Sequence, residues 1–267
     1  MAPERNPAGT TTALTSVEAD RILVRGYPMD ELMGRISFGD AIYLLVTGEL
    51  PSSSISRLIG ALLTGFIDHG VTPSAAVSRE AARAGVPLSG SIAAGLLALD
   101  RQPVSGGREC RQLLDQGLDL AGSSLLLATA ATDLVEQLVQ ADRIPPPGFG
   151  TQSHTSDPRV MRLLQMALEL EVDALYTQIL RAVGHALSRH PALEDQTLPI
   201  NLDGAMAAVC GDLGLDAATA DALLIVARVP GLAAHALEAK ARAGTRAGAE
   251  GPIRYDGPSE RRLPGRR

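Results

Sequence analysis

The sequence predicts a protein of the all-α class. Apolar residues recur at helical spacing in one segment after another, and Gly, Pro, Ser and Asn separate these segments. Alternation typical of long strands is missing from the pattern. Hydrophobic residues make up 45% of the 267 residues and aromatic residues only 3%, with no Trp. A globular core is therefore expected, in which helices pack through Leu, Ala, Val and Gly. The length suits one large domain, or a large and a small one.

The elements follow in order along the chain. Residues 1–15 are expected to form a flexible lead, and RILVRGY at 21–27 a short extended stretch closed by Gly26 and Pro28. Apolar spacing and stop signals then predict helices over 29–50, from 52 to an end at Asp68–His69–Gly70, and over 74–84, 90–99, 110–121, 123–141, 160–169, 174–188, 217–229 and 232–243. The breaks at 102–107 and 145–159 and the tail at 246–267 are rich in Gly and Pro. No period of 20–50 residues repeats, so a solenoid is excluded.

One stretch joins a turn signal to a helix and places a carboxylate at the junction. This is LPINLDGAMAAVCGDLGL, from Leu198 to Leu215. Asn201 or Asp203 can cap the helix by accepting hydrogen bonds from its first free N–H groups. The other interpretation of Asp203 is a general base at the mouth of a cleft. The stretch alone leaves both open.

Composition excludes several functional classes. A net charge of −6 argues against nucleic-acid binding, which needs a basic surface. Cys110 and Cys210 lie far apart with no CxxC pair, so neither a disulfide framework nor a zinc site is expected. No run reaches the 18 or so uncharged apolar residues of a membrane span, and MAPERNPAGTTT does not have a signal-peptide pattern. We expect a cytoplasmic protein.

Polar residues with glycine stand between the helices at a few places where side chains could converge. These are DHG at 68–70, SGG at 105–107, GFGTQSHTSDPR at 148–159, NLD at 201–203, and Arg228. Each has a plain structural alternative. His69 is also suited to be a cation at a helix C-terminus, Arg159 to pair with Asp157 at a helix start, and the two glycines at 148 and 150 to form simple turns.

The order of these blocks resembles the citrate synthase superfamily. RGYPMDELMGRISFGDAIYLLVTGELP is similar to the N-terminal signature of citrate synthase-like proteins. FIDHGVTPSAAVSR, PGFGTQSHTSDPR, LPINLDGAMAAVCGDLGL and ARVPGLAAHALE match further blocks in the same order. The short length, the DHGVTP form and the late YDGP resemble citryl-CoA lyases more than full-length citrate synthases. The resemblance covers roughly Thr15 to Leu263.

The resemblance implies an all-α fold with an active-site cleft between a large and a small helical domain, in a homodimer. The small domain would run over 108–215, and the large domain over 16–107 and 216–267. The chemistry implied is reversible C–C bond formation between an acyl-CoA enolate and a 2-oxo acid. A coenzyme A thioester would be the cosubstrate and a small carboxylate the partner, with no metal, nucleic acid or membrane.

The resemblance also implies residue roles. Asp203 takes the position of the family's catalytic base in its NVD motif. His69 takes that of the substrate-binding histidine of DHG, and Arg159 that of the carboxylate-binding arginine of DPR. Arg228 matches the arginine just before the PG turn. His154 matches a histidine of the GFG loop that is not the catalytic one, and we assign it to substrate binding.

Two departures from the family pattern bear on catalysis. Ser105 stands where the family has the enolate-stabilising histidine of HGG, and Thr151 where it has the histidine of GFGH. Gly251 replaces a late arginine, although Arg254 is near. The hydroxyls of Ser105 and Thr151 can donate hydrogen bonds, but they cannot carry a positive charge near neutral pH as imidazole can. Two hypotheses remain: an enzyme with altered chemistry or substrate, in which these hydroxyls reshape the catalytic pocket, or an inactive homologue that binds a ligand or a partner.

Overall fold

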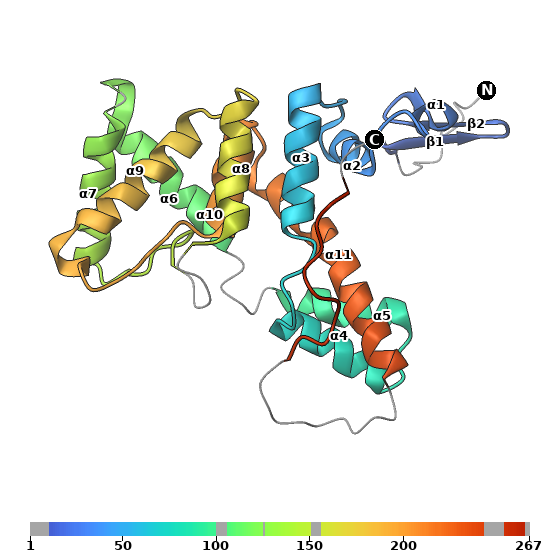
Figure 1. The fold of residues 1–267 in the computed structure, drawn as a ribbon. Helices are drawn as coiled ribbons and strands as arrows, with labels where there is room; N and C mark the ends of the chain where they lie inside the picture. Colours follow the sequence, from blue (N-terminus) through green and yellow to red (C-terminus); the bar gives the residue numbers. More distant parts are fainter. Residues whose placement is uncertain (1–10, 100–105, 125, 151–155, 243–253, 265–267) are drawn as a thin grey trace, which may run out of the picture. The chain divides into compact units, whose positions relative to one another are not determined.

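The computed structural model describes residues 11–99, 106–124, 126–150, 156–242 and 254–264. These residues are mostly helical (Figure 1), which confirms the prediction of an all-α fold. The helices are α1 (Met29–Leu32), α2 (Phe38–Thr47), α3 (Ser53–Gly65), α4 (Pro73–Arg83), α5 (Leu88–Leu97), α6 (Gly106–Ala121), η3 (Gly122–Ser124), α7 (Leu127–Gln140), α8 (Pro158–Glu169), α9 (Leu175–Arg189), η4 (Pro191–Leu193), α10 (Leu202–Asp212) and α11 (Ala217–Ala241).

A small antiparallel sheet precedes the helices. Strand β2 (Arg21–Val24) pairs with β1 (Thr15–Glu18) on one side and β3 (Tyr27–Pro28) on the other. The extended stretch predicted at 21–27 is confirmed for residues 21–24, the middle strand, whereas the chain turns at Arg25 and Gly26 and Tyr27 already belongs to β3. Val24 packs with Leu32 and Leu44 in a small core of its own.

Three predictions about helix limits are wrong. The break expected at 102–107 is shorter, because α6 begins at Gly106. The helix expected over 29–50 is interrupted at 33–37, because Ser37 and Asp40 form a reciprocal capping box that starts α2. The break expected near Pro230 is missing, and α11 runs through this proline as one helix. Residues on both sides of the proline are buried: Leu223 and Ala227 in the first unit, and Leu232 and Ala236 in the second. Packing outweighs the local cost of the proline here.

Helix α11 is also the one helix of the described residues that is long and apolar enough to cross a membrane, by length and composition alone. It contains Asp221, Arg228 and Glu238, so it is not an uncharged run. A core helix of a soluble protein passes the same test.

The chain forms two compact units, which we describe separately. The first comprises residues 1–68 and 99–230, and the second residues 69–98 and 231–267. In the second, α4 and α5 pack together, and the hydroxyl of Ser78 donates to the carbonyl of Leu232 over 3.3 Å. The division into domains at 108–215 stays a prediction.

Helix α10 is at the centre of the first unit. All but two of its residues are buried, and it contacts α6, α8 and α9. A helix that is apolar all round needs such a buried place. Its C-terminal Asp212 accepts hydrogen bonds from the backbone N–H groups of Ala174, Tyr176 and Thr177 over 2.8–3.0 Å, which ties it to the start of α9. These bonds fix the C-terminal end of α10 against α9.

Candidate active site

The cap of α10 is Asn201, not Asp203. The side-chain oxygen of Asn201 accepts a hydrogen bond from the N–H of Gly204 over 3.0 Å. Asp203 lies in the first turn of the helix and is half-buried. Of the two residues that could cap this helix, the structure therefore uses Asn201, and the carboxylate of Asp203 is left for another role.

The GFG loop is paired with the segment that leads into α10. The N–H of Asn201 donates to the carbonyl of Gly148 over 3.0 Å, and the N–H of Gly150 donates to the carbonyl of Pro199 over 2.8 Å. The side-chain amide of Asn201 also donates to the carbonyl of Gly150 over 3.2 Å. Asn201 thus holds both the helix start and the loop, so residues 148–150 and 199–203 form one rigid junction.

Glycine is required on both sides of this junction. Gly148 has a φ of +86°, and a Cβ placed there would lie 2.3 Å from the Sγ atom of Cys110 on α6. A Cβ on Gly204 would lie 2.4 Å from the carbonyl oxygen of Gly148. Side chains cannot fit at such distances, so these glycines allow the loop and the helix to approach each other closely. Gly148 is therefore not only a turn glycine, because it also allows the loop to contact α6 and α10 closely.

The surroundings of Asp203 favour its protonated form. Burial raises the pKa of its carboxyl to about 7, and the positive charge of Arg159 partly opposes this rise. Among the described residues, no hydrogen bond reaches the carboxylate. Cys110 faces the same junction, and burial, together with the charge of Asp203, raises the pKa of its thiol to about 12. A carboxyl group with a pKa near 7 can both accept and donate a proton at neutral pH.

Arg159 is positioned by the start of α8. Asp157 caps this helix by accepting from the N–H of Arg159 over 2.9 Å, and its carboxylate also accepts from the guanidinium Nη2 over 2.6 Å. Nη1 donates to the carbonyl of Gly65 over 3.3 Å. Arg159 and Asp157 therefore do pair at the helix start. This pair also orients the guanidinium of Arg159, whose charge acts on Asp203.

Arg228 of α11 is 1% exposed, although it is a cation. Its Nη1 donates to the carbonyl of Phe66 over 3.4 Å, next to the carbonyl that holds Arg159. Burial lowers the pKa of Arg228, Asp68 raises it, and the nearby charge of Arg159 lowers it further. Two guanidinium groups thus lie near each other at the C-terminal end of α3, where carbonyl groups favour cations. Such a pair is suited to bind a carboxylate.

The first unit therefore brings together three of the residues selected from the sequence: Asp203, Arg159 and Arg228. His69 is the first residue of the second unit. Ser105, Thr151 and His154 lie outside the described residues. Sequence reasoning missed Cys110, whose contact with Gly148 has no signal in spacing. It also treated Asp157 only as a helix-start residue, although this carboxylate orients Arg159.

The helical fold defines the class of the protein, which is citrate synthase-like. The sequence model of the family described as citrate synthase, C-terminal domain, matches residues 52–248. The chain belongs to this family, and the resemblance stated from its motifs is confirmed. Among curated proteins, no match was found.

Solved structures agree with this assignment. Citryl-CoA lyase from Hydrogenobacter thermophilus is 30% identical, with a TM-score of 0.77, and the alignment covers 96% of this chain and 97% of the lyase. ATP citrate lyase from Methanosaeta concilii, solved with (3S)-citryl-CoA, is 20% identical over 96% of this chain and 43% of its own, with a TM-score of 0.72. Citrate synthase from Thermotoga maritima is 15% identical over 95% of both chains, with a TM-score of 0.57. The last two share the fold.

Proposed function

We propose that the protein makes or cleaves a C–C bond between an acyl-CoA and an oxo or hydroxy carboxylic acid. The observation that carries this proposal is the state of Asp203. Asn201 caps α10 in its place, and burial raises the pKa of the Asp203 carboxyl to about 7. A structural cap needs no such pKa, whereas an acid–base group does. Its position in the NLD block corresponds to that of the family's base.

In the synthetic direction, the carboxylate of Asp203 removes a proton from the carbon next to the thioester carbonyl, and the electron pair of that C–H bond moves to the thioester oxygen as an enolate. The enolate carbon then attacks the ketone carbon of the oxo acid, and the ketone oxygen takes a proton from water. In cleavage, the hydroxyl gives its proton to water, the C–C bond breaks, and the protonated carboxyl of Asp203 returns a proton to the enolate carbon. Coenzyme A is a cosubstrate here, and no metal is invoked.

The other residues of the proposal bind substrate or complete the pocket. Arg159 and Arg228 would bind substrate carboxylates through their guanidinium groups, and His69 and His154 keep the substrate-binding roles implied by the family motifs. The hydroxyls of Ser105 and Thr151 would donate hydrogen bonds to the enolate and ketone oxygens. We place this activity in the cytoplasm.

An inactive scaffold is the second candidate, and one observation favours it. Removal of a single oxyanion donor costs about 10²–10³-fold in rate in other enzymes, and here both family histidines are replaced, by Ser105 and Thr151. Such a protein would bind a ligand or a synthase subunit without turning over.

The test compares wild type with Asp203→Asn, which keeps the shape and removes the titrating carboxyl. Acyl-CoAs and di- and tricarboxylates are first screened for thermal stabilisation, since a ligand that binds the folded state raises its stability. Turnover is then followed with the stabilising pair. We expect the variant to lose at least about 10²-fold in rate. Equal turnover of both proteins would exclude Asp203 as the acid–base group, and no turnover by either, with retained binding, would support the scaffold.

A further inference from the structure

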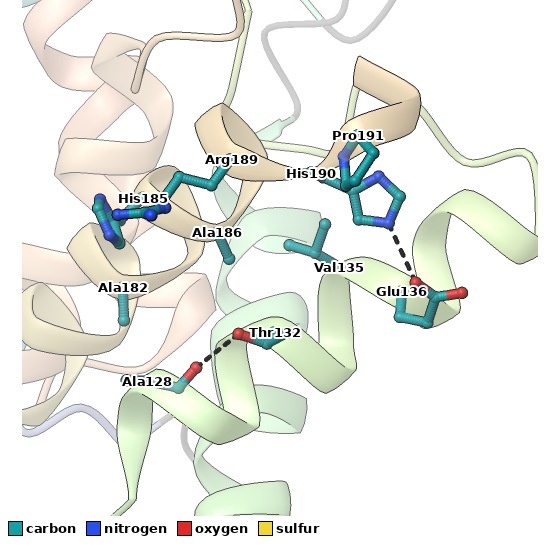
Figure 2. Close-up of a pocket in the computed structure, with 10 residues that line it drawn as sticks. All are labelled: Ala128, Thr132, Val135, Glu136, Ala182, His185, Ala186, Arg189, His190 and Pro191. Atoms are coloured by element: carbon teal, nitrogen blue, oxygen red, sulfur yellow. Dashed lines mark hydrogen bonds and ion pairs between the residues drawn. The ribbon is translucent and has the colours of Figure 1, made fainter. Parts of the chain in front are cut away.

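A pocket lies in the first unit between α7 and α9, and none of its lining residues belongs to the junction of residues 148–150 and 199–203. It has a volume of about 470 Å³ and is formed by α7, α9 and the start of η4 (Figure 2). Pockets that hold small ligands have about 300–1,000 Å³. The proposed reaction uses none of its residues.

Small side chains explain why the pocket is hollow. Ala182 and Ala186 lie one turn apart on α9, and Ala128 faces them from α7. Next to the pocket the same helices pack tightly, since Leu134, Leu138 and Val183 are at most 3% exposed. The two helices therefore cannot close the gap without disturbing this core, and the alanines leave an apolar floor.

The polar residues are separated into two ends. His185 and Arg189 lie four residues apart on one face of α9, and Figure 2 shows the side chain of Arg189 extending toward His185. Glu136 and His190 lie at the other end, joined by a hydrogen bond of 3.0 Å. Among the described residues, the guanidinium of Arg189 has no hydrogen bond or ion pair. One end thus offers a cation to a ligand.

The acidic end is already satisfied. Nδ1 of His190 accepts the N–H of Ala192 over 3.2 Å, so Nε2 is the nitrogen that faces Glu136 as a donor. Its Nε2–H therefore donates to Glu136, whose other oxygen accepts from Gln140 over 2.8 Å. The charge of Glu136 remains, and it would repel a second anionic group at this end.

We infer that this α7–α9 pocket binds a small monocarboxylate with a short hydrocarbon chain. The carboxylate pairs with Arg189, whose planar fork suits it, with His185 as a neighbouring donor. The hydrocarbon chain of the ligand lies on the apolar floor formed by Ala128, Ala182 and Ala186, away from Glu136. Dicarboxylates are disfavoured, in contrast to the site around Asp203, where two arginines lie close together.

The test titrates the full-length, ¹⁵N-labelled protein with butyrate and follows backbone amide shifts, with succinate and butanol as comparators at equal ionic strength. We expect butyrate to shift amides of α7 and α9 with a dissociation constant of about 1 mM. Succinate and butanol are expected to bind at least about tenfold more weakly. Glu136 repels the second carboxylate of succinate, and butanol has no carboxylate to pair with Arg189.

Matched variants locate the binding. Thr132→Leu fills the pocket from an exposed position of α7 and should abolish the shifts, whereas Thr129→Leu, exposed on the same helix outside the pocket, should keep them. Arg189→Gln should weaken binding about tenfold, and Arg143→Gln, an exposed arginine outside the pocket, should not. Circular dichroism checks that all four variants fold. Unchanged butyrate binding in Thr132→Leu or Arg189→Gln, equal binding of succinate, or no shifts with wild type would each overturn the inference.

Discussion

At the scale of single residues, the carboxyl of Asp203 determines how the rate depends on pH. Because its pKa is raised to about 7, half of it is ionised at neutral pH. Removal of a proton from an acyl-CoA needs the carboxylate form of Asp203. The rate of this proton removal should therefore rise with pH and level off above about pH 7. It is measured as exchange of the acyl-CoA α-protons in D₂O across pH 5–9. A limb at the ordinary Asp pKa of about 3.9 would contradict this environment.

The same residue makes a prediction about stability. A carboxyl whose pKa is higher in the folded state than in the unfolded chain binds its proton more tightly when folded. Its ionisation therefore destabilises the fold: the cost is absent below the unfolded pKa of about 3.9, grows between 3.9 and 7, and is complete above 7. Asp203→Asn removes this cost.

We therefore expect Asp203→Asn to raise the free energy of unfolding by on the order of 2 kcal/mol at pH 8 and by almost nothing at pH 4. Denaturant unfolding at both pH values measures the difference. The cap at Asn201 is untouched in this variant, so a loss of stability at pH 8 would mean that Asp203 makes structural contacts that outweigh its desolvation.

At the scale of elements, the contact between α10 and the GFG loop depends on Gly204. Alanine is favoured over glycine inside a helix by about 1 kcal/mol, yet a Cβ at this position would meet the carbonyl of Gly148 at 2.4 Å. We expect Gly204→Ala to lower the free energy of unfolding by about 2–4 kcal/mol, because the loop or the helix must move.

The matched control is Gly60→Ala in α3, where a Cβ would meet nothing within 4 Å among the described residues. This change should stabilise by about 0.5–1 kcal/mol. Thermal unfolding of both variants separates helix propensity from the close approach. If Gly204→Ala behaves like the control, the loop is not packed on α10 as described.

Periodicity predicted most helices to within a few residues, and the failures have physical causes. In 29–50 the apolar spacing continues across residues 33–37, whereas the capping box of Ser37 and Asp40 decides where α2 begins. At Pro230 the local signal favours a break, but burial on both sides keeps α11 continuous. Tertiary packing overrides local preference in the second case, and side-chain capping overrides periodicity in the first.

At the scale of the whole molecule, the motifs located the three residues that the first unit brings together, Asp203, Arg159 and Arg228. They could not show that Asn201 rather than Asp203 caps α10, since both suit an N-cap. The spacing likewise gave no sign of the contact between Cys110 and Gly148, because that contact joins residues of different helices. The pKa of Asp203 follows from this three-dimensional burial, and so it too lay beyond sequence reasoning.

One prediction at this scale is a homodimer. Large apolar side chains lie seven residues apart on single helices and are exposed in the chain: Phe38 and Leu45 on α2 are 79% and 40% exposed, and Met161 and Leu168 on α8 are 63% and 61% exposed. Such faces favour burial against a second copy. Light scattering at micromolar concentration should give twice the chain mass of 27.8 kDa. A stable monomer would contradict the prediction.

The last prediction concerns the two replaced histidines. Wild type should convert acetyl-CoA and oxaloacetate to citrate, and cleave citryl-CoA, at less than a tenth of the usual enzyme turnover of about 10 per second, since hydroxyls at 105 and 151 cannot supply the charge or the proton relay of imidazole. The double variant Ser105→His and Thr151→His should raise both rates by about 10²-fold or more. The control is the triple variant that adds Asp203→Asn to these two changes. It should stay at the background rate, because without the base no enolate forms for the new histidines to stabilise. Stopped assays of citrate and of free thiol measure synthesis, and assays of oxaloacetate measure the cleavage of citryl-CoA. A wild-type turnover within tenfold of 10 per second would show that Ser105 and Thr151 are adequate replacements, and a double variant with unchanged rates would show that their positions do not correspond to those of the family's histidines.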